Sequence, residues 1–95
     1  MLTIEKITKT IREVAHKYGI KRVKLFGSRA TNHYRENSDV DLIVEFEKSA
    51  VSLFILASLM NELEEKFGVS VDIIHGPIKK DSMLEIEKEI EIYAA

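Results

Sequence analysis

The chain has 95 residues, of which 45% are hydrophobic and 32% charged, a composition typical of one small globular domain covering residues 1–95. It contains no cysteine, which excludes disulfides and thiolate metal sites. No apolar run has the length of a membrane span and no signal-peptide pattern is present, so we expect a cytoplasmic protein without a membrane partner.

The net charge of −2 is unevenly distributed along the chain. Residues 1–37 carry nine Lys and Arg against three Asp and Glu, whereas residues 38–95 carry five against thirteen. This asymmetry predicts a basic side for phosphates and an acidic side for a metal or a basic partner. Solvated helix faces that merely differ in composition would give the same pattern.

The first expected element is a helix over residues 4–18, in which apolar side chains recur at three- and four-residue steps. Thr3 is its expected N-cap, and Gly19 stands where a left-handed residue ends a helix. A short strand at 23–26 follows and leads into a turn, with a brief helix beginning at Ser28.

The middle of the chain predicts a strand, a helix and a second strand. Residues 39–47 alternate between apolar and polar side chains, as in a half-buried strand. A helix over 53–67 ends at Gly68, and its apolar stripe is expected in the core. That stripe consists of Leu53, Leu56, Met60, Leu63 and Phe67. Residues 69–74 alternate again.

The end of the chain predicts a last helix over 82–93. Ser82 and Glu85 fit a capping box, and four apolar residues follow the helical spacing. These residues are Met83, Ile86, Ile90 and Tyr93. The outer face of such a helix would be acidic near its C-terminal end, where the helix dipole disfavours negative charge. A basic partner or solvent would relieve that repulsion.

Three carboxylates are expected on one face of the sheet. Asp39 and Asp41 are two positions apart in one strand, so their side chains project to the same face. Asp72 is likewise opposite in parity to the apolar face of its strand. If both strands bury their apolar faces under the same helices, all three carboxylates share the open face. This pattern predicts an α/β (α+β) fold, a small mixed β-sheet with helices packed on one face.

The run Gly27-Ser28-Arg29-Ala30, followed after about ten residues by Asp39-Val40-Asp41, resembles the signature of the DNA polymerase β-like nucleotidyltransferase superfamily. The short length is similar to that of its minimal, MNT-type members, and Val71-Asp72-Ile73 offers the third carboxylate of the family. The resemblance implies the polymerase-β-like core. One departure is Asn32, where relatives often carry Gly; Asn also accepts a left-handed backbone.

The resemblance also implies the roles of the site residues. Asp39, Asp41 and Asp72 would be catalytic and would hold two Mg²⁺ ions, which clamp the attacking and leaving oxygens. Gly27 and Ser28 would bind the phosphates of ATP. Arg29 would add to this nucleotide-binding set, and Arg35 is a further candidate; a plain surface charge is the favoured alternative for both.

The implied function is transfer of AMP from ATP to a hydroxyl, expected to be a tyrosine, of a HEPN-family toxin, with this chain as antitoxin. One alternative is a non-catalytic module that neutralises its partner sterically. Another is a nucleotidyltransferase acting on a small molecule or on nucleic acid; the acidic net charge and the lack of a long basic stripe argue against nucleic acid. The small core and uneven charge are compatible with a homo-oligomer.

Overall fold

A computed structural model describes residues 2–30, 35, 38–77 and 89–95. The predicted first helix is confirmed as α1, Ile4–Tyr18, whose core-facing residues include Ile7 and Ile11. Thr3 caps it, because its hydroxyl accepts a hydrogen bond from the Lys6 N–H at 3.1 Å. Gly19 ends it in the left-handed region, with φ 64°.

The second predicted helix is confirmed as α2, Leu53–Phe67, capped by Ser52 and ended by Gly68. The prediction that its whole apolar stripe lies in the core is wrong for the first residue of the stripe. Leu53 is 83% exposed, whereas Leu63 is fully buried. The reason is that the first turn of α2 precedes the part of the helix that packs on the sheet. Phe54, beside Leu53, is 81% exposed as well.

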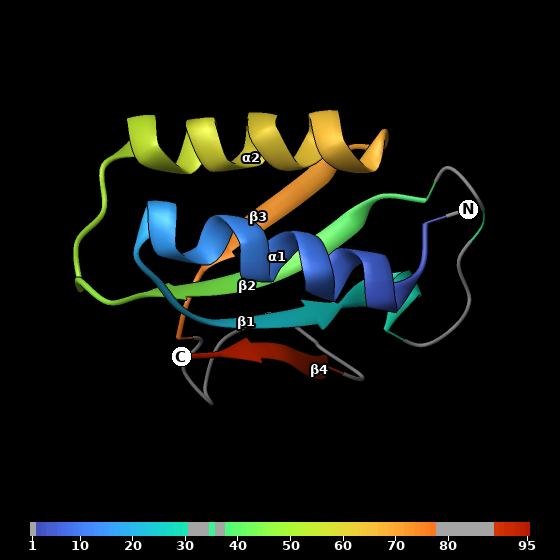
Figure 1. Ribbon diagram of the computed structural model, residues 1–95, viewed down its shortest axis with the longest axis horizontal. Coiled ribbons are helices and arrows are strands. Elements are labelled where there is room, and N and C mark those ends of the chain that lie inside the picture. Colours follow the sequence, from blue (N-terminus) through green and yellow to red (C-terminus); the bar gives the residue numbers. More distant parts are fainter. Residues whose placement is uncertain (1, 31–34, 36–37, 78–88) are drawn as a thin grey trace.

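Four strands form one mixed sheet in the order β3-β2-β1-β4 (Figure 1). They are β1, Ile20–Phe26; β2, Val40–Phe46; β3, Val71–His75; and β4, Glu89–Ala94. β1 runs antiparallel to both β2 and β4. β2 and β3 are parallel, because α2 forms the crossover between them.

Both helices cover the same face of the sheet, as predicted, and no described helix lies on the other face, called here the open face (Figure 1). The side chains that face the helices form the core together with those of α1 and α2. From the central strands these are Val23, Leu25, Val40, Leu42 and Val44. The alternate residues of β1 and β2 therefore lie on the open face. No helix within the described ranges has both the length and the apolar character needed to cross a membrane.

The prediction of a last helix is wrong for residues 89–94, which form the edge strand β4. Glu89 and Glu91 lie opposite Phe26 and Lys24 of β1, so the acidic residues belong to a sheet and not to a helix C-terminus. The alternation of Glu and Ile fits a strand, and pairing satisfies the free backbone groups of β1. The preceding residues of the expected helix, 82–88, lie outside the described residues, as does Asn32.

Candidate functional site

The first part of the site is the turn that follows β1. Gly27–Arg29 form one turn of 3-10 helix, η1, where a brief helix was predicted. Gly27 has φ 76°, a conformation that glycine adopts without strain. A Cβ built on Gly27 would collide with Asp41 Oδ2 and would lie 3.2 Å from Asp41 Cγ. The absence of a side chain at Gly27 therefore lets this turn lie directly against a carboxylate.

The second part is a pair of carboxylates on adjacent strands. Asp41 of β2 and Asp72 of β3 are register partners in the parallel pair. Asp72 is exposed and Asp41 half-buried. The two side chains therefore lie next to each other on the open face, as strand parity predicts. Their role in catalysis stays a prediction.

The electrostatics of this pair are unfavourable for two negative charges. Burial raises the pKa of Asp41 above its usual value, and the neighbouring carboxylate of Asp72 raises it further. The charge of Asp39 raises the same pKa, which places all three carboxylates in one electrostatic group. A bound cation would reverse this cost.

Asp39 lies just before β2, with an exposed side chain and a fixed backbone. The next residue, Val40, donates its N–H to Ser70 O at 2.9 Å, which ties this point to the start of β3. The preceding residue, Ser38, accepts hydrogen bonds from Arg29 at its carbonyl. The backbone on either side of Asp39 is thus held by different elements.

Arg29 is 2% exposed, so the alternative that it is a surface charge is wrong. Its Nε and Nη2 donate to Ser38 O at 3.1 and 2.8 Å, and its Nη1 donates to Leu2 O at 3.4 Å. These backbone contacts hold the η1 turn to the segment before β2. Ser28, one residue earlier, is half-buried in the same turn, and Arg35 is exposed. The predicted nucleotide contacts of Ser28, Arg29 and Arg35 stay predictions.

Glu64 of α2 is a site neighbour that sequence reasoning missed. Its Oε2 accepts a hydrogen bond from the Val71 N–H at 3.0 Å, at the outer edge of β3. Glu64 and Asp39 line the same shallow hollow of about 510 Å³, together with Gly68, Val69 and Ser70. No periodicity could have indicated this contact, because Glu64 lies on an otherwise ordinary polar face of its helix.

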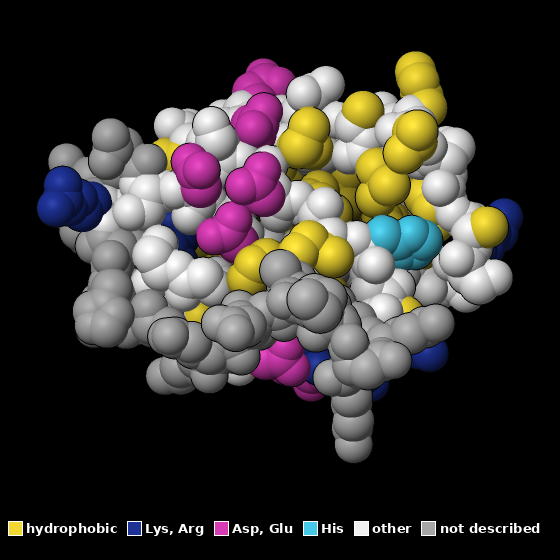
Figure 2. Space-filling model, turned by 180° about the vertical axis from the view of Figure 1, so that it is seen from behind, with side chains coloured by type: hydrophobic (Ala, Val, Ile, Leu, Met, Phe, Trp, Pro, Cys, Tyr) yellow, Lys and Arg dark blue, Asp and Glu magenta, His cyan; other side chains and the backbone are white. Residues whose placement is uncertain are grey.

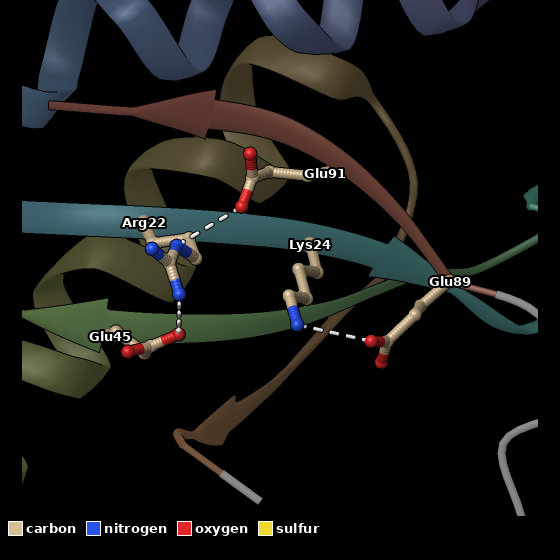
Figure 3. Close-up of polar contacts among 5 residues, drawn as sticks. All are labelled: Arg22, Lys24, Glu45, Glu89 and Glu91. Atoms are coloured by element: carbon tan, nitrogen blue, oxygen red, sulfur yellow. Dashed lines mark hydrogen bonds and ion pairs between the residues drawn. The ribbon is translucent and has the colours of Figure 1, made fainter.

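Acidic side chains gather on the side of the sheet away from α1, next to an apolar area (Figure 2). Elsewhere on the open face the cations of β1 are already paired with carboxylates (Figure 3). Arg22 Nε lies 3.0 Å from Glu91 Oε1, and Lys24 Nζ lies 3.0 Å from Glu89 Oε1. Glu45 Oε2 lies 3.6 Å from Arg22 Nη1. The carboxylates of Asp39, Asp41 and Asp72 take no part in these ion pairs and form a separate acidic region.

The carboxylate oxygens fit Mg²⁺ by their chemistry. Mg²⁺ in nucleotide enzymes is held by one or two carboxylates, with substrate phosphates and waters as further ligands. Asp41 and Asp72 supply such a pair, with Asp39 as a third candidate. Within the described part of the chain, no three or more Asp, Glu, His or Cys side chains form a ready metal cage. A carboxylate pair leaves the other ligand positions of Mg²⁺ to phosphate oxygens and water.

Comparison with known proteins gives one family and several relatives. Residues 7–94 match the family model described as nucleotidyltransferase domain. A relative from Methanocaldococcus jannaschii, named as a protein adenylyltransferase, is 41% identical over 88 residues, which is 87% of this chain and 92% of the relative. The protein adenylyltransferase MntA of Thermococcus cleftensis is 33% identical over 78 residues, 78% of each chain.

Solved structures agree with the sequence matches. A minimal nucleotidyltransferase structure is 35% identical, with a TM-score of 0.64 over 78% of each chain. Two toxin–antitoxin structures share the fold at lower identity. One contains AMP-PNP (19% identity, TM-score 0.72, 99% of this chain and 75% of that chain). The other is a complex of tri-AMPylated HEPN toxin with MNT antitoxin from Shewanella oneidensis (13%, 0.69, 98% and 74%).

Proposed function

The chain belongs to the nucleotidyltransferase domain family and is an enzyme of that kind, and we propose that it transfers AMP from ATP to a hydroxyl of a partner protein. The observation that carries this proposal is the contact of Gly27 with Asp41 beside Asp72. This observation supports the proposal because phosphate and metal would then be held side by side. The names of the relatives support AMP as the transferred group.

The residues divide into two sets in this proposal. Gly27 and Ser28 receive the β- and γ-phosphates, because glycine permits close approach and the turn presents N–H groups and a hydroxyl. Asp39, Asp41 and Asp72 hold Mg²⁺, with two ions as the family pattern implies. When bound, Mg²⁺ neutralises phosphate charge and lowers the pKa of an attacking hydroxyl.

The transfer forms one bond and breaks one bond at the α-phosphorus. The acceptor oxygen forms a bond to the α-phosphorus, and the bond from the α-phosphorus to the bridging oxygen of pyrophosphate breaks. The hydroxyl proton passes to a carboxylate, for which Asp72 is the candidate because it is exposed to an incoming acceptor. Pyrophosphate leaves with the electron pair.

We propose a tyrosine of a HEPN-family toxin as the acceptor, with this chain acting as its antitoxin in the cytoplasm, where ATP is available. The complex of tri-AMPylated HEPN toxin with MNT antitoxin supports this partner class. The toxin–antitoxin structure with AMP-PNP supports an adenine nucleotide as donor. Tyrosine is proposed because the resemblance of this chain to MNT-type nucleotidyltransferases implies a tyrosine acceptor.

The test uses ATP labelled at the α- or the γ-phosphate, Mg²⁺, and a purified HEPN-family protein from the same genome. With wild type, we expect label on that protein from α-labelled ATP and none from γ-labelled ATP. With Asp39→Asn/Asp41→Asn, we expect no label from either. Glu5→Gln/Glu13→Gln, at exposed positions of α1, is the matched control and should transfer normally. Loss of label when the acceptor tyrosine becomes phenylalanine identifies the hydroxyl. If wild type and Asp39→Asn/Asp41→Asn neutralise the HEPN-family protein equally and neither labels it, the result would favour steric neutralisation.

A further inference from the structure

One cation is buried between the η1 turn and the strand that carries the carboxylates. The guanidinium of Arg29, 2% exposed, donates from Nε and Nη2 to Ser38 O and from Nη1 to Leu2 O. One side chain therefore joins three parts of the backbone: the η1 turn, the N-terminal segment and the residue before Asp39.

The Ser38 carbonyl belongs to the peptide bond that joins Ser38 to Asp39. On the other side, Val40 donates to Ser70 O at 2.9 Å. The position of Asp39 thus depends on Arg29 on one side and on the entrance to β3 on the other. Because Gly27 and Arg29 share one short turn, the same guanidinium sets the spacing between Gly27 and Asp39.

Arginine suits this position for a geometric reason. Its planar fork presents five N–H donors in fixed directions, so it can bind two carbonyl oxygens from different segments at once. Lysine has one flexible ammonium and cannot reproduce that fork. A guanidinium is retained in a buried place only where hydrogen bonds compensate its lost hydration.

We propose that Arg29 is a positioning residue for nucleotidyl transfer, which fixes Asp39 relative to Gly27 and Ser28 without contacting the nucleotide. This inference rests on the proposed function, because the geometry it fixes is that of the phosphate turn and the carboxylates. It assigns Arg29 a role different from the nucleotide contact that the resemblance implies.

The test compares wild type, Arg29→Lys and the exposed control Arg12→Lys, at a temperature where circular dichroism shows all three folded. Two quantities are measured: the kcat and KM for ATP in AMP transfer, and the affinity for AMP-PNP with and without Mg²⁺. For Arg29→Lys we expect kcat to fall about 100-fold, the scale of a misplacement near 1 Å, with KM rising by no more than about tenfold. The Mg²⁺-dependent gain in AMP-PNP affinity should fall about tenfold, and Mg²⁺-free affinity should stay unchanged.

Three results would overturn the inference. A higher KM with unchanged kcat would mean that Arg29 contacts the nucleotide. A lower melting temperature with unchanged kcat and unchanged Mg²⁺ dependence would mean a purely structural role. A wild type that neither transfers AMP nor gains AMP-PNP affinity with Mg²⁺ would overturn the proposed function as well, which separates the two failures. If Arg29→Lys does not fold, Arg29→Met replaces it, since an apolar side chain leaves no unpaired buried charge, and the same pattern is expected.

Discussion

At the scale of single residues, the site sets local stability against function. Asp41 is half-buried beside Asp72, and burial with the two neighbouring carboxylates raises its pKa. Its ionised form is therefore less favourable in the folded chain than in the unfolded chain. A structural role gives no reason to retain this arrangement, whereas cation binding does.

Replacing Asp41 by Asn should raise the free energy of unfolding at pH 7 in the absence of divalent metal. The folded-state pKa of Asp41 is raised, so its unfavourable contribution is absent below the unfolded pKa of about 3.8, grows as pH rises from there to the folded pKa, and is constant above it. The advantage of Asp41→Asn should accordingly vanish near pH 3 and shrink when Mg²⁺ is added. Urea unfolding at several pH values measures this; a variant less stable than wild type at pH 7 without metal would contradict it.

Gly27→Ala should damage the site more than an alanine at another glycine with positive φ. The new Cβ would collide with the Asp41 carboxylate, whereas a Cβ on Gly19 (φ 64°), which does not line the site, meets nothing within 4 Å. Both variants should lose about 1–2 kcal/mol to backbone strain. Gly27→Ala alone should also lose most AMP transfer and weaken AMP-PNP binding, as measured by calorimetry. Equal activity of the two variants would show that the Gly27–Asp41 contact has no functional role.

At the scale of elements, local sequence patterns predicted the helices and strands that local interactions determine. Helical spacing with caps at Thr3 and Ser52 was sufficient for α1 and α2, and alternation was sufficient for β2. The end of the chain was ambiguous because Ile90 and Tyr93 fit a helix spacing while Glu89 to Ile92 alternate. Pairing with the free edge of β1, a contact between residues far apart in sequence, decides this case.

The ion pairs across β1 test that pairing. In a double-mutant cycle, Lys24→Met and Glu89→Gln should show a coupling of about 0.2–1 kcal/mol, typical of cross-strand pairs, because Nζ and Oε1 are 3.0 Å apart (Figure 3). High salt should reduce it. Lys21→Met, at an exposed position of the same strand, should show no coupling with Glu89→Gln. A coupling absent at low salt would count against the register of β4.

For the site, too, the sequence predicted some positions and not others. Strand parity placed Asp41 and Asp72 on one face, because the side-chain period of a strand is fixed. The buried position of Arg29 and the contact of Glu64 with Val71 were not predictable. Both depend on how loops return to the sheet, which no local pattern encodes.

At the scale of the whole molecule, the uneven charge of the sequence is partly resolved by folding. Arg22 and Lys24 come from the basic N-terminal part and pair with Glu45, Glu89 and Glu91 from the acidic remainder. Acidic side chains still gather in one region of the face that Figure 2 shows. The charges of Asp72 and Asp39 raise the pKa of Asp41, which marks a local excess of negative charge.

The apolar side chains at the start of α2 should contribute little to the stability of the isolated chain. Leu53 and Phe54 are more than 80% exposed, so Leu53→Ser/Phe54→Ser should change the free energy of unfolding by no more than about 0.5 kcal/mol. Leu63→Ala, at a fully buried position of the same helix, should cost about 2–5 kcal/mol. Chemical denaturation measures both. A large loss in the serine variant would mean that these side chains are covered in solution.

The central claim is that the carboxylates of the open face make this chain an AMP-transferring enzyme. Its most direct test is the intact mass of the HEPN-family protein after co-expression with wild type or with Asp39→Asn/Asp41→Asn. We predict added adenylate only with wild type, while both forms still co-purify with that protein. An unmodified HEPN-family protein that is neutralised by both forms would contradict the claim.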